Sequence, residues 1–264
     1  MYAILVFVVV LMLIPFVLVF SGSFKTQGEF IADPGAWFPK TFNFDNYVTL
    51  FTQKGFGGYL INSVIVATIA VLANVIFGAM AGYALAKLNF KGRQLMFVAV
   101  MGAMTVPYVA VFVPQFFIIV QLGLVNTLAG IALPLLVMPI SVFIMRQFAY
   151  SVPDELLEAA RMDGAGEIRT FATVFIPLAG PALATVSILS FLYSWNYFLW
   201  PLIVAQSQNV YTAPIGLAVA SQASNTTAFG LLLAGAVVVL LPVLILFLFL
   251  QRYFIQGVAT AGLK

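Results

Sequence analysis

The 264-residue sequence contains no cysteine and no histidine, and only 7% of its residues are charged. The absence of cysteine excludes disulfide bonds and thiol chemistry. The scarcity of charge excludes an ordinary soluble domain, in which roughly a quarter of the residues are charged. What the chain has in abundance is apolar side chains, because 63% of its residues are hydrophobic. The composition therefore predicts a protein that lies in a membrane.

Four long stretches contain no charged residue at all: residues 1–24, 55–86, 94–145 and 170–251. A helix needs ~20 apolar residues to cross the hydrocarbon of a bilayer. The first two stretches fit one crossing each, and the last two fit two crossings each. We therefore expect an all-α polytopic membrane protein, with a single transmembrane domain over residues 1–264 and six transmembrane helices. The expected spans are residues 3–20, 59–84, 95–120, 128–145, 180–203 and 229–250.

The expected spans lack the groups with which many membrane proteins do chemistry. They contain no acidic, basic or histidine side chain, whereas ion- and proton-driven carriers place titratable or chelating groups at membrane depth. The chain has no phosphate-binding Gly-x-x-x-x-Gly-Lys-Ser/Thr loop, and no span offers a nucleophile–base pair or metal cluster. We expect no cofactor on this chain and no nucleic-acid partner. The lack of a nucleophile–base pair or metal cluster disfavours a membrane-embedded enzyme. If the chain drives transport, the energy would have to come from another polypeptide, which disfavours a self-sufficient carrier or channel.

The basic residues predict the orientation in the membrane. One side of the expected bundle carries eight of them and the other side three, and cytoplasmic loops are the ones enriched in Lys and Arg. Both termini, the loop 148–178 and a tail at 251–264 are therefore predicted to be cytoplasmic, in a multi-pass protein of the cell membrane. The eight residues are Lys87, Lys91, Arg93, Arg146, Arg161, Arg169, Arg252 and Lys264, and the three are Lys25, Lys40 and Lys54.

Five of the eight acidic residues gather in the loop 148–178. Ser151, Pro153 and the acids that follow predict a short helix with a hydroxyl cap and a first-turn proline, and Gly164 suits its end. Apolar residues follow one side of it. The loop is thus either a docking element for a partner or an amphipathic helix on the membrane, with Glu158 and Arg161 as a surface pair. The acids are Asp154, Glu155, Glu158, Asp163 and Glu167, and the apolar residues are Leu156, Leu157, Ala160 and Met162.

A spaced motif favours the docking element. Glu158-Ala159-Ala160 is followed after three residues by Gly164, and after nine more by Val174-Phe175-Ile176-Pro177. This resembles the EAA loop of ABC importer permeases, whose pattern is Glu-Ala-Ala-x3-Gly-x9-Ile-x-Leu-Pro, with Val174 and Ile176 as apolar replacements. The resemblance implies a type I ABC importer permease fold in which this loop, between helices 4 and 5, forms the coupling helix. The residues implied in docking are Glu158, Ala159, Ala160, Arg161, Asp163, Gly164 and Pro177.

The family resemblance also implies partners. They are a second homologous permease, two ATP-hydrolysing subunits that bind ATP and Mg²⁺, an extracytoplasmic solute-binding protein, and the lipid bilayer of a bacterial or archaeal cell membrane. Transport would proceed by alternating access. In maltose-type relatives the partner permease makes most contacts with the solute, so this chain is not required to make any.

Further stretches resemble carbohydrate permeases in particular. Residues 194–201, Ser-Trp-Asn-Tyr-Phe-Leu-Trp-Pro, resemble the Ser-Trp-Asn-x-Phe-Leu signature of that group, and the permease core 59–250 and the tail resemble the second permease of maltose-type systems. A sugar or polyol is the implied solute, and a glycerol-phosphate-type solute is the alternative. The neutral and aromatic groups suited to a path are Asn62, Ser63, Ser194, Trp195 and Asn196, which equally suit helix packing and the interfacial belt. Gly78 and Gly82 form a small-xxx-small face that predicts close helix packing.

Overall fold

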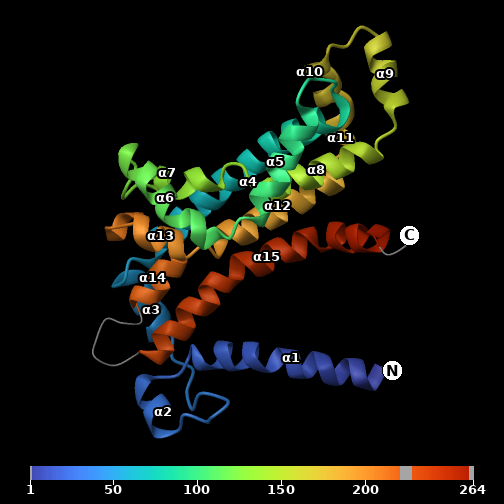
Figure 1. Cartoon of the computed structure of the whole chain (residues 1–264). Helices are drawn as coiled ribbons and strands as arrows, with labels where there is room; N and C mark the ends of the chain where they lie inside the picture. Colours follow the sequence, from blue (N-terminus) through green and yellow to red (C-terminus); the bar gives the residue numbers. More distant parts are fainter. Residues whose placement is uncertain (1, 221–227, 262–264) are drawn as a thin grey trace. The chain divides into compact units, whose positions relative to one another are not determined.

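The computed structural model describes residues 2–220 and 228–261, and all regular secondary structure in these ranges is helical. Figure 1 shows the helices in chain order. The expected all-α class is confirmed. Helices long and apolar enough to cross a membrane number four in the described residues, or six when two bent pairs are each counted as one span.

The four single spans extend beyond their predicted bounds. The structure has α1 at Tyr2–Gly22, α4 at Phe56–Lys87 and a composite span at Leu128–Ser151, while α15 runs over Phe229–Ala261. The composite span consists of α7 (Leu128–Ala132), a 3-10 turn at Leu133–Leu135 and α8 (Pro139–Ser151). Most of the predicted tail 251–264 therefore continues α15 as helix, and residues 262–264 lie outside the described part of the chain.

The other two spans are broken. The predicted helix 95–120 is two helices, α5 (Arg93–Thr105) and α6 (Tyr108–Gln121), bent by 104°. Pro107 stands at the break and cannot donate a backbone hydrogen bond, which explains why the helix stops there. The predicted helix 180–203 was too long, because α12 covers only Gly180–Trp195 and a separate α13 covers Leu199–Val204. The segment Glu167–Leu178 precedes α12 at an angle of 81°.

The chain divides into two compact units, of which the second comprises residues 63–206 and 246–264. Its core joins α4, α8 and α12 through a cluster of buried side chains that includes Tyr83, Met145 and Phe175. The prediction of close packing at Gly78 and Gly82 is confirmed: a Cβ on Gly82 would lie 2.6 Å from the Cβ of Met145 and 2.7 Å from the amide nitrogen of Arg146. The absence of a side chain lets the backbones of α4 and α8 meet.

Asn74 holds the broken segment before α8. Its side-chain amide donates to the carbonyl of Leu135 at 2.6 Å, and its carbonyl oxygen accepts from the amide of Met138 at 2.7 Å. In a continuous helix the carbonyl of Leu135 would accept from residue 139, which is a proline without an N–H. Asn74, fully buried on α4, therefore supplies the hydrogen bonds that the irregular backbone lacks, as the membrane interior requires.

The first unit comprises residues 1–62 and 207–245. Besides α1 it contains α2 (Gln27–Ala32), α3 (Asp45–Thr52), a 3-10 turn at Gln208–Val210 and α14 (Ala213–Ala220). Its core is formed by the buried side chains of Leu50, Phe56, Tyr59, Ala213, Ala220 and Leu231. At Gly216 a Cβ would lie 2.1 Å from the ring of Tyr59, so that ring packs directly on the backbone of α14.

Candidate functional site

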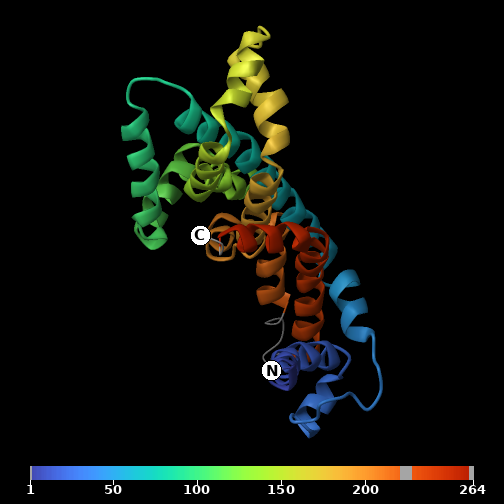
Figure 2. The same cartoon turned by 90° about the vertical axis from the view of Figure 1, so that its right-hand side faces the viewer.

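The acidic loop of the sequence contains a short exposed helix, α9, over Asp154–Met162. Figures 1 and 2 show it at one end of the second unit, beyond the end of α4. The predicted hydroxyl cap is wrong. Ser151 is the last residue of α8 and donates to the carbonyl of Phe148, while Pro153 occupies the N-cap without a side-chain hydrogen bond. The positive end of α9 is instead complemented by Asp154 and Glu155 in its first turn.

Gly164 ends α9 as the sequence predicts. Its φ is +84°, in the left-handed region that favours glycine. The amide of Ala165 donates to the carbonyl of Ala160 at 3.0 Å, and the amide of Gly164 donates to that of Arg161 at 2.9 Å. This pair of bonds is a Schellman motif. It turns the chain back toward α10 (Glu167–Thr170), a π-helical turn at Phe171–Phe175 and α11 (Ile176–Leu178).

Lys87, the last residue of α4, fixes the start of α9. Its Nζ lies 2.5 Å from Oδ1 of Asp154 and donates to the carbonyl of Val152 at 2.6 Å. The side chain of Lys87 is 6% exposed and that of Asp154 is 71% exposed. The hydrogen bond and the charge of Lys87 hold the pKa of the Asp154 carboxyl below its ordinary value. One buried amine thus bridges both sides of the junction between α8 and α9.

A second link joins α4 to the end of α9. Nε of Arg161 lies 2.9 Å from Oε1 of Glu167, and the Tyr83 hydroxyl donates to Oε2 of Glu167 at 3.3 Å. The hydrogen bond to Glu167 raises the pKa of the Arg161 guanidinium. The sequence interpretation that pairs Glu158 with Arg161 is wrong, because the two ion pairs of the described residues are Lys87–Asp154 and Arg161–Glu167. The carboxylate of Glu158 is left on an exposed surface.

Apolar side chains of this element divide into an inner and an outer set. Leu157 is 1% exposed and belongs to the core of the second unit, so its side chain anchors α9 to that core. Met162 and Ile168 are 88% and 85% exposed. The remaining predicted docking residues are accessible as well: Ala160 is partly buried, and Ala159, Asp163, Gly164 and Pro177 are exposed. The element is therefore held firmly on one side and open on the other.

The predicted path residues have different surroundings in the two units. Asn62 in the first unit donates from its side chain to the carbonyls of Asn209 and Tyr211, at 2.8 and 2.9 Å, and so ties the segment before α14 to α4. Ser63 is buried. In the second unit, Ser194 donates to the carbonyl of Ser190 within α12, and Trp195 is 1% exposed and stacked on Phe191.

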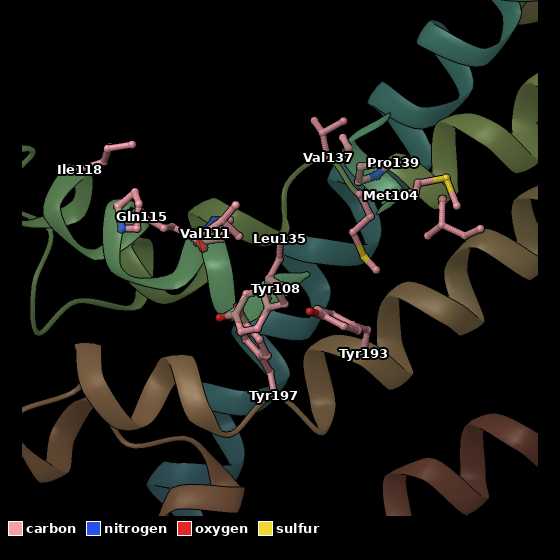
Figure 3. Close-up of a pocket in the computed structure, with 15 residues that line it drawn as sticks. Met104, Tyr108, Val111, Gln115, Ile118, Leu135, Val137, Pro139, Tyr193 and Tyr197 are labelled. Atoms are coloured by element: carbon pink, nitrogen blue, oxygen red, sulfur yellow. Dashed lines mark hydrogen bonds between the residues drawn. The ribbon is translucent and has the colours of Figure 1, made fainter. Parts of the chain in front are cut away.

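Asn196 does face a cavity. It lines a hollow of about 580 Å³ together with Tyr108, Tyr193 and Tyr197, and the same three tyrosines line a neighbouring hollow of about 680 Å³. Figure 3 shows these tyrosines together, with Gln115 and Val111 further along α6. The hydroxyls of Tyr108 and Tyr197 are 2.5 Å apart. The residues that line the two hollows carry no charge, so the surface they offer is aromatic with a few neutral polar groups.

The positions of Tyr108 and Arg146 could not be predicted from the sequence. Tyr108 reaches the cavity only because the helix breaks at Pro107, so a continuous helix 95–120 gives no reason to single it out. Arg146 was predicted to lie on the cytoplasmic side between the fourth and fifth spans, directly after the span 128–145, yet it is 8% exposed within α8. Its guanidinium carbon lies 3.4 Å from the centre of the Phe97 ring, and its nitrogens donate to Leu85 and Tyr150. These contacts connect α4, α5 and α8.

The helices long and apolar enough to cross a membrane, together with the exposed element at α9, define a multi-pass membrane protein. Comparison with known proteins identifies its family. Residues 74–260 match the family model described as "Binding-protein-dependent transport system inner membrane component". The chain belongs to this family: it is the permease subunit of an ABC transporter, located in the inner membrane, and membership implies ATPase and solute-binding-protein partners.

Individual relatives cover most of the chain. The arabinooligosaccharides permease AraQ of Halalkalibacterium halodurans is 42% identical over 86% of this chain and 81% of its own length. The trehalose permease SugB of Mycobacterium tuberculosis is 34% identical over 96% of this chain and 92% of its own. A crystal structure of a bacterial ABC transporter involved in the import of the acidic polysaccharide alginate matches with a TM-score of 0.84 and 25% identity, over 96% of this chain and 95% of that one.

Proposed function

We propose that this chain imports a neutral oligosaccharide or polyol by alternating access, and that α9 is the coupling helix on which an ATPase subunit docks. The chain is the permease subunit of a carbohydrate ABC importer. Relatives that transport arabinooligosaccharides, trehalose, and melibiose, raffinose and stachyose support this class. ATP and Mg²⁺ would bind to two ATPase subunits, and a second homologous permease would complete the membrane part.

The observation that carries the coupling role is the two-sided character of α9. Met162 and Ile168 are large apolar side chains left in the open at the end of an otherwise charged element. Exposed apolar residues rimmed by polar ones mark surfaces that a partner covers. On the opposite side, Leu157, Lys87 and the Arg161–Glu167 pair attach the helix to the membrane core. A push on the open side would therefore reach α4 and α12 without being absorbed by a flexible loop.

The contacts of Lys87 indicate how a movement of α9 would be transmitted to the membrane helices. Because Nζ of Lys87 contacts both Val152 and Asp154, α9 cannot swing about the junction with α8 without breaking a partly buried hydrogen bond. Motion of α9 would then be passed to the end of α4, whose close contact with α8 at Gly82 extends the rigid body into the membrane. We infer that α4, α8 and α9 move together in the transport cycle.

The cavity supports a neutral solute. The faces of Tyr108, Tyr193 and Tyr197 suit sugar rings, and Asn196 and Gln115 can hydrogen-bond hydroxyl groups without the desolvation cost of a charge. A glycerol-phosphate-type solute would need cations, which bind phosphate by charge-assisted hydrogen bonds. The cavity lining of this chain supplies none. Three predicted path residues are buried and would stabilise the path by packing: Ser63, Ser194 and Trp195. Asn62 would hold the segment before α14 in place.

The orientation proposed from the basic residues places α9 and both termini in the cytoplasm and the segment around Gln208–Val210 outside. The solute-binding protein would deliver its cargo on that outer side. Closure of the ATPases on ATP would open the cavity outward, and hydrolysis would return it to the inward-facing state.

Replacement of Met162 tests the docking surface. In the assembled transporter, Met162→Asp should weaken co-purification of the ATPase subunit and reduce solute-stimulated ATP hydrolysis at least tenfold, because it buries a charge in the interface. Met162→Leu conserves volume and apolarity and should retain activity. Equal activity in the two variants would exclude Met162 from the interface.

Replacement of Tyr193 tests the cargo. The residue is 43% exposed in the cavity, so its loss should not unfold the chain. Tyr193→Ala should raise the KM of uptake, because it removes an apolar face, whereas Tyr193→Phe should keep most of the affinity. Uptake of glycerol phosphate rather than a sugar by the wild-type complex would contradict the neutral-solute proposal while leaving the coupling role of α9 intact.

A further inference from the structure

A short segment after α1 exposes four large aromatic side chains. Residues 36–44, here called the outer strap, have the sequence Ala-Trp-Phe-Pro-Lys-Thr-Phe-Asn-Phe and form no helix. The exposed fraction of these aromatic residues lies between 51% and 68%, and they are Trp37, Phe38, Phe42 and Phe44. Such a density of exposed aromatic surface in nine residues calls for something that covers it.

The strap is attached to the end of α1 through its backbone. The hydroxyl of Ser21 donates to the carbonyl of Trp37, and Nζ of Lys25 donates to the carbonyl of Ala36. The amide of Asn43 donates to the carbonyl of Phe24 at 3.2 Å. Phe24 itself is buried beneath the strap, with its ring 5.5 Å from that of Phe42 and 5.2 Å from that of Phe44. Because backbone groups make these attachments, the strap's position relative to α1 is fixed while its side chains remain open.

The length of α1 sets the depth of the strap. Its 21 residues, at a rise of 1.5 Å per residue, span roughly 30 Å, which is the thickness of the hydrocarbon core. Its side chains from Tyr2 to Phe20 are almost all exposed, as suits a helix surrounded by lipid or other membrane helices. Ser21 is the next-to-last residue, so the boundary of the hydrocarbon falls where Ser21 holds Trp37.

The side-chain chemistry fits that depth. Tryptophan is enriched at membrane–water interfaces, where its amphipathic ring lies among the headgroups. The one charged residue of the strap is Lys40, which is exposed and bears the charge that attracts lipid phosphate. The acidic residues of the loop lie outside the strap: Glu29 and Asp33 are on α2 and at its C-cap, and Asp45 begins α3 (Asp45–Thr52) directly after the strap. The carboxylate of Glu29 accepts from the backbone amide of Lys40 at 3.1 Å, which is a further backbone attachment of the strap. The strap thus combines apolar rings with a cation and has no carboxylate.

We propose that the outer strap is an interfacial lipid anchor, with its aromatic rings in the headgroup region and Lys40 beside the lipid phosphates. It holds the outer end of α1, and the start of the segment that leads to α3, at constant depth while the core alternates. This inference depends on the membrane placement of α1 and not on the identity of the cargo. A surface for the solute-binding protein is the competing use of the same rings, and site-directed spin labelling distinguishes the two.

The chain has no cysteine, so one introduced cysteine can carry a nitroxide label. Phe38→Cys is the test position because no ring contact involves it among those of the described residues, and Trp37→Cys is a second position. Asp33→Cys, exposed in the same loop, is the matched control. The full chain is labelled, assembled with its partner subunits and reconstituted in vesicles of phosphatidylethanolamine and phosphatidylglycerol. Accessibility to oxygen, which concentrates in lipid, is compared with accessibility to a water-soluble nickel complex.

Labels at Phe38 and Trp37 should show an oxygen-to-nickel accessibility ratio several-fold above that at Asp33, corresponding to a depth near the lipid phosphates. Addition of the solute-binding protein should leave this ratio unchanged. A ratio at Phe38 and Trp37 equal to that at Asp33 would overturn the proposal. So would labels that become immobilised and protected only when the binding protein is added, which would assign the strap to protein docking.

Discussion

The amine of Lys87 and the carboxylate of Asp154 are 2.5 Å apart, although 67 residues separate them in the chain. The contact joins Lys87, the last residue of α4, to Asp154, the first residue of α9. Since Lys87 also donates to the carbonyl of Val152, the C-cap residue of α8, it holds both sides of the junction between α8 and α9. The start of α9, which we propose as the coupling helix, is thus attached to the end of α4 as well as to α8.

We expect Lys87→Met to be more harmful than Asp154→Asn. The lysine variant leaves the carbonyl of Val152 without its donor and Asp154 without its cation, and a buried group left unsatisfied costs about 1–3 kcal/mol. The asparagine variant removes only an exposed partner, whose ion pair is screened by water. Solute-stimulated ATP hydrolysis and melting temperature of the complex measure this order. Equal losses in both variants would contradict the bridging role of Lys87.

The ion pair should be insensitive to pH in the physiological range. The folded-state pKa of Asp154 is lower than its ordinary value, so its contribution is fully present above the unfolded pKa of about 4, and is lost as pH falls through the folded pKa. The difference in melting temperature between wild type and Asp154→Asn should therefore stay constant from about pH 8 to 5. A difference that already declines between about pH 7 and 5 would assign the effect to another group.

Gly164 and Gly166 provide a matched pair of glycines in the segment between α9 and α10. Gly164 has a φ of +84°, and a side chain there is strained by about 1–2 kcal/mol. Gly166 has a φ of −70°, and a Cβ added to it would meet nothing within 4 Å. Gly164→Ala should lower coupled ATP hydrolysis and Gly164→Asp should abolish it, with membrane insertion intact. Gly166→Ala should behave as wild type, and a defect of the same size there would show that the loop tolerates no change.

Alanine substitutions at Gly82 and Gly102 distinguish the effect of helix–helix contact on stability from that of helix propensity. A Cβ at Gly82 would meet the backbone of α8 below 3 Å, whereas one at Gly102 in α5 would meet nothing within 4 Å. Gly82→Ala should lose about 1–3 kcal/mol through overpacking. Gly102→Ala should be neutral or more stable by up to about 1 kcal/mol, because alanine favours helix. Thermal unfolding in detergent checks both, and a neutral Gly82→Ala would contradict the packing of α4 on α8.

Asn74 offers a test of the broken span. Asn74→Leu keeps the volume but leaves the carbonyl of Leu135 and the amide of Met138 without partners, at about 1–3 kcal/mol each. The variant should reduce the yield of folded transporter more than Ser187→Ala. Ser187 bonds only to the carbonyl of Leu183 in its own helix, and that carbonyl keeps its helical donor. Comparable yields of the two variants would argue against the role of Asn74.

The sequence predicts what depends on composition and local spacing. Charge-free runs indicate the spans, and Gly164 indicates the end of α9, because a residue with positive φ is so often glycine. The bends do not follow from such patterns: Pro107 breaks a helix, while Pro114 and Pro242 lie inside α6 and α15. Before Pro139, the irregular backbone takes its hydrogen bonds from Asn74, a residue of α4 that is distant in the sequence.

The other contacts that the sequence did not predict join residues that are distant in the chain or lie outside the local pattern. Nothing in the local sequence pairs Lys87 with Asp154 or moves Arg161 from Glu158 to Glu167. Arg146 reads as a loop residue because charge is expected in water, but its neighbours Phe97 and Tyr150 allow it to be buried. The candidate path shows the same limit. A polar residue in a span can either bind a backbone carbonyl or line a cavity, and its type does not show which. Asn62 donates to a backbone carbonyl, whereas Asn196 lines a cavity.

The central claim, that α9 docks on an ATPase subunit, is tested most directly by cross-linking. The cysteine-free chain allows a single Ala159→Cys on the exposed side of α9, with Thr52→Cys on the exposed surface of α3 as the control. In the assembled transporter, a short photoactivatable reagent on the thiol of the Ala159→Cys variant should yield an adduct with the ATPase subunit, and the same reagent on the Thr52→Cys variant should not. Absence of the adduct in the Ala159→Cys variant, in a complex that still couples ATP hydrolysis to uptake, would contradict the account.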